Sequence, residues 1–200
     1  DDDMSDLASA VVLATDTQIA DFTVELDTYD EATVKALLEN EEQLDLAREK
    51  IQALLHGAHT LPDGRRVFKT EDGFKVFDEF GAELDAAIID PAEISDALPR
   101  WETLVEAREG VQSLETQRTE ILEFQQRVDD ARERLGDDDL SEDDLAELGA
   151  ALEGEMPDAV KRQMPGYEPT QTPDLAQGFA NAARQPVAEP LTGPSTQPQF

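Results

Sequence analysis

The sequence contains no cysteine and two histidines, and its 16 Lys and Arg residues stand against 47 Asp and Glu. Without cysteine there are no disulfides and no thiolate metal sites, and the redox compartment is left undetermined. The scarcity of Lys and Arg argues against a nucleic-acid reader and against binding to an anionic membrane, because phosphates are bound by clustered cations. We therefore expect a protein partner, with no direct contact to nucleic acid or membrane.

Long apolar runs are also lacking. No segment approaches the roughly 18 apolar residues of a spanning helix, and the short run ASAVVLA at 8–14 has acidic flanks where a signal peptide has basic ones. Apolar residues make up 39 % of the chain, below the usual share of about 45–50 %, so a thick core is not expected. We expect a soluble protein in the cytoplasm, or in the virion if the protein is of phage origin.

What the chain has in excess is negative charge, a formal −31. Residues 136–155 hold nine acidic side chains and no basic one, whereas residues 156–200 are nearly balanced. Seven of the eleven prolines fall in 165–200, spaced among Gln, Thr, Gly and Ser. This composition is typical of an extended tail with few backbone partners of its own, which becomes ordered on a partner.

Apolar periodicity predicts two long helices. The first is expected over 30–57, with Asp30 as N-cap and Gly57 as C-cap. The second is expected over 99–136, where a seven-residue repeat favours a coiled-coil-like interface seam. The polar residues Arg118, Gln125 and Arg132 indicate that the C-terminal half of the seam is either hydrated or held by polar pairs. The seam residues are Leu104, Ala107, Val111, Leu114, Ile121, Val128 and Leu135.

Two alternatives stay open for this second helix. It is either part of a coiled coil or an ordinary amphipathic helix packed on a small core. In either case the pattern does not decide whether the helices pair within one chain or between chains.

Between the helices, short strands at 65–70 and 74–78 flank Glu71-Asp72-Gly73, a strong hairpin-turn signal. The hairpin holds four of the sixteen basic residues and is the one locally basic place on an acidic chain. These cations are either solubilising edge residues or a docking site for an acidic partner, and Trp101 is expected to anchor the hairpin against the helices. The hairpin docking residues are Arg65, Arg66, Val67, Phe68, Lys69, Phe74, Val76 and Phe77.

The order helix, β-hairpin, long helix over residues 30–136 resembles the architecture of prefoldin-type chaperone subunits, whose antiparallel helical arms are joined by hairpins that assemble into shared β-structure. The resemblance implies an oligomer built through the hairpins. A lone hairpin is marginal in water, so this one is expected to pack on the helix ends or to join strands of another copy.

Beyond residue 136, Ser141 and Asp144 form a capping-box pattern that predicts a third helix, followed by a short helix over 157–164. The first 29 residues combine strand-like and helix-like spacing, and we favour a helix. The acidic patch before and within the third helix invites a calcium interpretation, but no EF-hand spacing accompanies it. We interpret it as a solvated helix entry. The acidic patch residues are Asp137, Asp138, Asp139, Glu142, Asp143 and Asp144.

Catalytic signals are not found. His56 and His59 lack the carboxylate or cysteine companions of a metal site, and no phosphate loop, nucleophile elbow or Ser–His–Asp pattern occurs. We therefore expect no catalytic residues, no metal and no cofactor.

Together these patterns predict a mainly α fold. Its elements are a long antiparallel, coiled-coil-like helical hairpin, a two-stranded β-hairpin between the helices, a short third helix and an extended Pro-rich tail. The expected segments are 1–29, 30–136, 137–164 and 165–200.

The functional hypothesis is a non-enzymatic assembly, scaffold or adaptor protein that acts through coiled-coil and hairpin contacts, by self-association or within a larger assembly. Chaperone-like subunits and phage or mobile-element structural components fit this description. The alternative is an acidic nucleic-acid mimic, an inhibitor or antitoxin that occupies the basic cleft of a DNA-binding protein.

Overall fold

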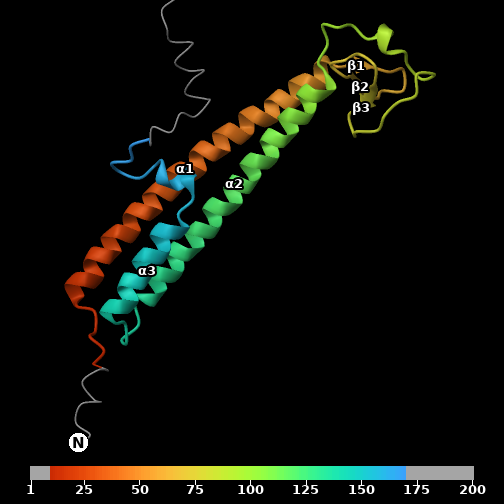
Figure 1. Cartoon of the computed structure of the whole chain (residues 1–200). Coiled ribbons are helices and arrows are strands. Elements are labelled where there is room, and N and C mark those ends of the chain that lie inside the picture. The colour runs from red at the N-terminus through yellow and green to blue at the C-terminus, as the bar shows by residue number, and fades with distance from the viewer. Residues whose placement is uncertain (1–9, 170–200) are drawn as a thin grey trace, which may run out of the picture. The chain divides into compact units, whose positions relative to one another are not determined.

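Two long helices dominate residues 10–169, the part of the chain that the computed structural model describes (Figure 1). Helix α1 (Asp16–Gly57) and helix α2 (Trp101–Arg134) run antiparallel, side by side. At about 1.5 Å per residue, the 42 residues of α1 extend about 60 Å. The prediction of a mainly helical chain is confirmed.

The chain divides into two units, residues 1–167 and 168–200, and every helix and strand of the described residues belongs to the first. The predicted proline-rich tail over 165–200 lies outside the described residues from residue 170 onward.

Helix α1 begins well before the predicted N-cap. Thr15 caps it: the Thr15 hydroxyl accepts a hydrogen bond from Gln18 N (3.1 Å), and Gln18 Oε1 accepts one from Thr15 N (2.9 Å). This reciprocal pair satisfies two donors that the helix end leaves free. The predicted start at Asp30 is wrong, because Asp30 lies inside the helix with its carboxylate bound by Arg132. The favoured helix for the first 29 residues is present from Asp16.

Side-chain contacts establish the antiparallel pairing of α1 and α2. Tyr29 packs edge-on against Phe124, with ring centroids 6.0 Å apart. Towards the other end, Asn40 Nδ2 donates to Leu114 O (2.9 Å), and Ala58 packs with Leu104 at the start of α2.

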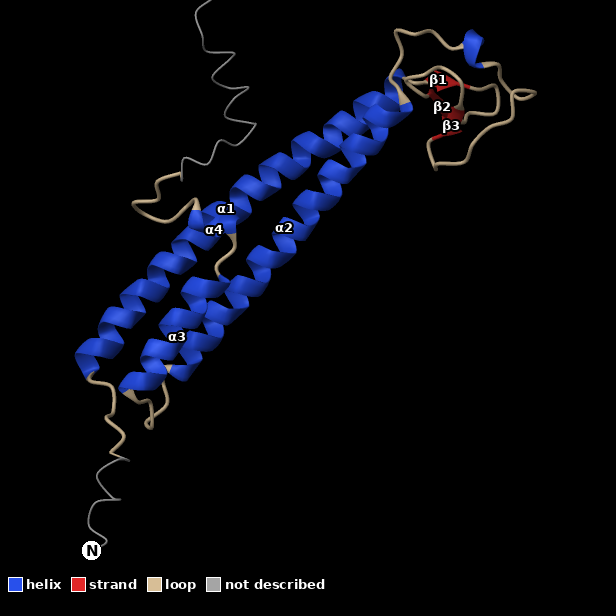
Figure 2. Ribbon diagram, in the orientation of Figure 1, coloured by secondary structure: helices blue, strands red, loops and turns tan. Residues whose placement is uncertain are grey.

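Helices α3 (Glu142–Glu155) and α4 (Asp158–Lys161) pack against one half of the α1–α2 pair (Figure 2). The predicted capping box of α3 is confirmed, with Asp144 N donating to Ser141 Oγ (3.0 Å). The main core forms where the helices meet, and each fully buried large apolar side chain there contributes about 1.5–3 kcal/mol. Its larger members are Phe22, Leu26, Tyr29, Ile121, Phe124, Val128, Leu152, Met156 and Val160.

The segment 58–100, which we call the β-module, joins α1 to α2. Strands β1 (His59–Thr60), β2 (Arg66–Lys69) and β3 (Val76–Asp78) form an antiparallel sheet in the order β1-β2-β3. The predicted hairpin is present as β2 and β3, and Gly73 in its turn takes the positive φ of 79° that glycine tolerates. The sheet has three strands instead of the predicted two, because the chain after α1 folds back along β2.

Residues 79–98, for which the sequence suggested no element, pack against this sheet. The segment includes the 3₁₀ helix η2 (Pro91–Glu93). Its Ile89 and Ile94 are buried with Val67 and Val76 of the sheet, forming a second, small core. The β-module therefore buries apolar side chains of its own, which a lone two-stranded hairpin does not.

Candidate interaction surfaces

The predicted seam of α2 lies inside the chain. Leu104, Ala107, Ile121 and Val128 are buried, and the other three residues, Val111, Leu114 and Leu135, are half-buried. Leu104 packs with Phe68 of the β-module, whereas Ile121 and Val128 pack in the core formed with α1, α3 and α4. The two ends of the seam are therefore buried by contacts within the chain, whereas Val111 and Leu114 in its middle stay partly accessible.

Of the three polar positions predicted in the seam, Arg132 makes hydrogen bonds and ion pairs to α1. Its ion-pair partners are Asp27 and Asp30. The hydrogen bonds from Arg132 to these two aspartates raise the pKa of its guanidinium, and the bond to Asp27 has the largest effect. The buried Asn40 contacts Gln117 of α2.

Three of the four cations of the predicted hairpin docking site are used within the β-module or at its junction with α1. Arg65 Nε lies 2.7 Å from Asp63, and Arg66 donates to the main-chain oxygen of Leu55. Lys69 is buried. Lys75 is exposed and makes no ion pair among the described residues. The basic side chains therefore serve the fold more than they form a patch for an acidic partner.

Lys69 ties the sheet to the segment that leads into α2. Its Nζ donates to Ile94 O (2.8 Å) and to Asp96 Oδ1 (2.6 Å). The hydrogen bond and charge of Lys69, with the charge of Arg100, hold the pKa of Asp96 below its ordinary value. Arg100 also donates a hydrogen bond to Thr70 O (3.1 Å). Lys69 and Thr70, at the end of β2, are therefore both bound to the segment that leads into α2.

Trp101 anchors the β-module on α2, as the sequence predicted. Its ring stacks on Phe77 with centroids 4.8 Å apart and an interplanar angle of 20°. It also packs against Phe68 at 6.4 Å. Of the eight hairpin docking residues, Val67, Phe68, Lys69 and Val76 are buried, so half of them are unavailable to a partner. The others are the half-buried Arg65, Arg66 and Phe77 and the exposed Phe74.

Two phenylalanines of the β-module remain outside these contacts. Phe74, beside Gly73, is 80 % exposed, and Phe80, beside Gly81, is 85 % exposed. The docking residues predicted from the sequence include Phe74 but not Phe80, although the position of Phe80 next to Gly81 of a turn is a signal that it is not in the core. Phe74 borders a groove of about 500 Å³, whose lining residues are Phe74, Lys75, Val76, Glu83, Leu84, Asp85, Ala86, Ile89 and Pro91.

The acidic patch is organised around Arg134 at the end of α2. The Arg134 guanidinium lies 2.6 Å from Asp137, 3.2 Å from Asp139 and 3.4 Å from Asp144. A backbone hydrogen bond from Ser141 is the main cause of the lowered pKa of Asp144. The ion pairs of the acidic patch therefore link the end of α2 to the α2–α3 loop and to the first turn of α3.

The other members of the patch differ in their surroundings. Glu142 accepts a hydrogen bond from Gln18 Nε2 (3.1 Å), while Asp138 and Asp143 are exposed and in no ion pair among the described residues. Within residues 10–169 no cluster of His, Asp and Glu has the arrangement of a metal site. His56 is exposed and His59 lies in β1.

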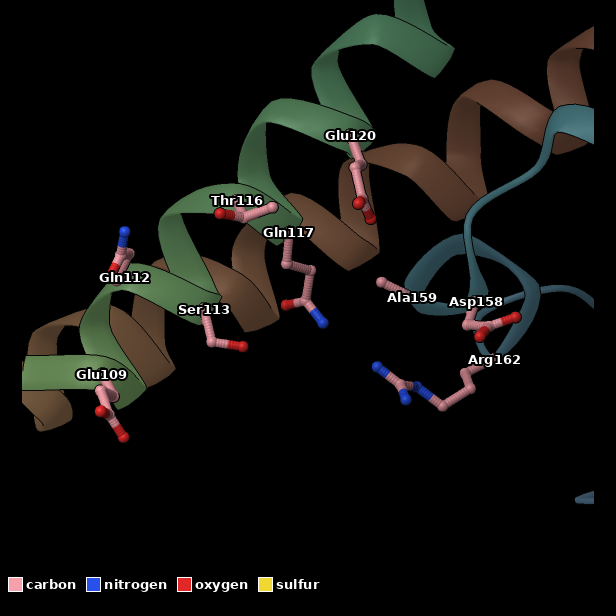
Figure 3. Close-up of a pocket in the computed structure, with 9 residues that line it drawn as sticks. All are labelled: Glu109, Gln112, Ser113, Thr116, Gln117, Glu120, Asp158, Ala159 and Arg162. Carbon is pink, nitrogen blue, oxygen red and sulfur yellow. The ribbon is translucent and has the colours of Figure 1, made fainter. Parts of the chain in front are cut away.

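A polar groove of about 600 Å³ lies between α2 and α4 (Figure 3). Arg162 and Asp158 stand on the α4 side, opposite the α2 side chains. The lining supplies carboxylates, hydroxyls, amides and one guanidinium, and it pairs no nucleophile with a histidine or lysine base. The lining residues are Glu109, Gln112, Ser113, Thr116, Gln117, Glu120, Asp158, Ala159 and Arg162.

Comparisons of the chain with protein-family models, curated proteins and solved structures found no match. Assembly through the hairpins, which the prefoldin-like order of elements implies, therefore stays a prediction. Among the described helices, none combines the length and apolarity that crossing a membrane requires.

Proposed function

We propose that the protein is a non-enzymatic adaptor of an assembly, in which α1 and α2 act as a coiled-coil-like spacer and the β-module binds a protein partner. The observation that carries the proposal is the exposure of Phe74 and Phe80 in a module that packs its other aromatic side chains.

Large aromatic side chains supply much of the binding energy at protein interfaces when a partner buries them. In the β-module, Phe68 and Phe77 are already used against Trp101. Phe74 and Phe80 have no such packing, and Phe74 borders a groove that contains the apolar side chains of Leu84 and Ile89. A partner with an apolar projection gains contacts at this groove.

The charges beside these phenylalanines indicate the chemistry of the partner. Asp72, Glu79, Glu83 and Asp85 are close to Phe74 or Phe80 in the chain, and Lys75 is the nearby exposed cation. A partner surface with an apolar centre and a basic rim complements this arrangement and is steered towards it. A second copy of the chain presents the same acidic rim, so we favour a different protein as partner.

Structural components of phages and mobile elements, in the cytoplasm or the virion, and chaperone-like subunits are settings for such an adaptor. In either setting, the role proposed for the α1–α2 pair, about 60 Å long, is to hold the β-module away from the rest of a complex.

The test is photo-crosslinking from the β-module in the cells that make the protein. A photoreactive residue replaces Phe74 or Phe80 in separate variants, and replaces Leu46 of α1, also exposed, as a matched control. We expect one protein to be crosslinked from positions 74 and 80 and not from 46. Excess unlabelled wild-type chain should compete with this crosslink, whereas the Phe74→Ser/Phe80→Ser chain should not. Equal crosslinking from all three positions would contradict the proposal.

The acidic mimic is the second candidate, and the exposed carboxylates of Asp138 and Asp143 favour it. In this case the partner is a DNA-binding protein, and Asp138→Asn with Asp143→Asn should weaken its binding while Phe74→Ser should not. The opposite pattern supports the adaptor.

A further inference from the structure

Residues 11–14 form a short extended segment beside the entry of α3. Ala14 N donates to Leu140 O (2.9 Å), and Glu142 N donates to Val12 O (2.8 Å). Leu13 stands opposite Ser141 as an antiparallel bridge. The segment thus has the backbone conformation and one hydrogen-bonded edge of a β-strand.

The second edge of this segment is open among the described residues. In an antiparallel pair, alternate residues direct their N–H and C=O groups to opposite sides. Val12 and Ala14 direct theirs to residues 140–142, so Val11 and Leu13 direct theirs away. No hydrogen bond of the Leu13 backbone occurs among the described residues. An open edge of this kind is a template for another strand.

The side chains of the segment are apolar and exposed. Val11 is 71 % exposed, Val12 57 % and Leu13 54 %. The β-branched Val11 and Val12 favour a strand, and because successive side chains of a strand point to opposite faces, Val11 and Leu13 lie on one face and Val12 on the other. In the sequence this run is part of ASAVVLA, a short apolar stretch with acidic flanks where a signal peptide has basic ones.

The charged groups that flank the segment are acidic. Asp16 follows it, and Glu142 and Asp143 lie on the paired stretch and its continuation. Arg134, the cation at the centre of the acidic patch, is already bound by three aspartates. A strand that adds to this edge therefore complements it best with apolar residues alternating with Lys or Arg, and a second copy of this chain does not offer such a strand from the same region.

From these observations we infer that residues 11–14 are a β-augmentation site for an extended basic segment of a protein partner. Main-chain hydrogen bonds of Val11 and Leu13 provide affinity, apolar contacts of the exposed side chains add to it, and the acidic flanks select a basic sequence. The site belongs to the α3 entry and is independent of the β-module, so the adaptor has a second docking surface beyond the one proposed above.

The test uses the full chain and a fluorescent eight-residue probe peptide of alternating Lys and Val. We expect saturable binding by fluorescence anisotropy, and slower hydrogen exchange of the Leu13 amide when the probe is bound. A peptide of alternating Glu and Val should not bind.

Two variants with the same charge change separate strand addition from simple charge attraction. Leu13→Asp and Val24→Asp each add one negative charge at an exposed apolar residue. We expect Leu13→Asp to weaken binding at least tenfold and Val24→Asp to leave it unchanged. Equal affinities of the two variants, unchanged exchange at Leu13, or no saturable binding would each overturn the inference.

Discussion

Asn40 donates a hydrogen bond of 2.9 Å from its Nδ2 to Gln117 Oε1, across the interface of α1 and α2. The Asn40 residue is buried, and its Oδ1 has no partner among the described residues. A polar residue at such a position specifies the register of a helix pair at a cost in stability. The α1–α2 alignment thus depends on a polar contact as well as on apolar burial.

Replacing this residue tests that cost. Asn40→Leu removes the unpaired oxygen, and Gln117 is half-buried, so its amide is able to turn to water. We expect the free energy of unfolding to rise by roughly 1 kcal/mol, measured by urea denaturation. Asn40→Ala, which leaves a cavity, should lower it. A loss of stability in Asn40→Leu would show that the two hydrogen bonds of Asn40 Nδ2, to Leu114 O and Gln117 Oε1, outweigh the orphaned oxygen.

The seam of α2 permits a comparison between adjacent residues. Ile121 is buried in the main core, whereas Leu122 is exposed. Ile121→Asp buries an unpaired charge and should lower the free energy of unfolding by about 4 kcal/mol or more. Leu122→Asp should change it by about 0.5 kcal/mol or less. Similar losses in thermal unfolding for both variants would contradict the placement of the seam.

The Lys69–Asp96 contact predicts a pH dependence. Because the pKa of Asp96 is lowered in the folded chain, its ionised form stabilises the fold above the ordinary aspartate pKa of about 4, and this is lost as the pH falls through the lowered value. Asp96→Asn should therefore be less stable than wild type at neutral pH, with a difference that shrinks below about pH 4. Fluorescence of Trp101, the one tryptophan of the chain, reports on the β-module during urea unfolding. A difference that is constant with pH would contradict this prediction.

We expect the phenylalanines of the β-module to differ in their contribution to stability. Phe77→Ser removes the ring stacked on Trp101 and should lower the free energy of unfolding by about 2 kcal/mol. Phe74→Ser and Phe80→Ser remove exposed rings and should change it by about 0.5 kcal/mol or less. Urea titrations followed by circular dichroism measure all three. Large losses for Phe74→Ser or Phe80→Ser would assign those rings to the fold instead of to a partner.

Salt should stabilise the protein. With a formal charge of −31, mutual repulsion of carboxylates opposes the folded state, and raising the ionic strength from about 0.1 M to about 1 M shortens the screening length from about 10 Å to about 3 Å. We expect the thermal midpoint to rise by several degrees in KCl. A falling midpoint would mean that ion pairs such as Arg132–Asp30 outweigh the repulsion.

The sequence predicted the elements whose signals are local. The Ser141–Asp144 capping box and the Asp-Gly turn at Gly73 depend on neighbours within a few residues, and the structure confirms them. The end of α1 was predicted to within one residue: Gly57, the expected C-cap, is the last helical residue, and the C-cap is Ala58. The start of α1 was missed because Asp30 is also a good N-cap residue. Its actual role, binding Arg132, joins residues about a hundred positions apart.

The candidate surfaces were harder to predict for the same reason. Local spacing identified Val128 as a seam residue, but burial by α1, α3 and α4 depends on the tertiary fold. The basic hairpin was expected to be a surface feature, and only the folded segment 79–98 reveals that Lys69 is enclosed by Ile94 and Asp96. Strand β1 has two residues, too few for an alternating pattern.

Solution mass by light scattering, at about 0.1 M and about 1 M salt, tests the central claim that the α2 seam is satisfied within one chain and that partners bind elsewhere. We expect 22.0 kDa, the mass of a single chain, under both conditions. A larger mass that persists at high salt would contradict it, because it would mean that the apolar seam or the hairpin is shared between copies.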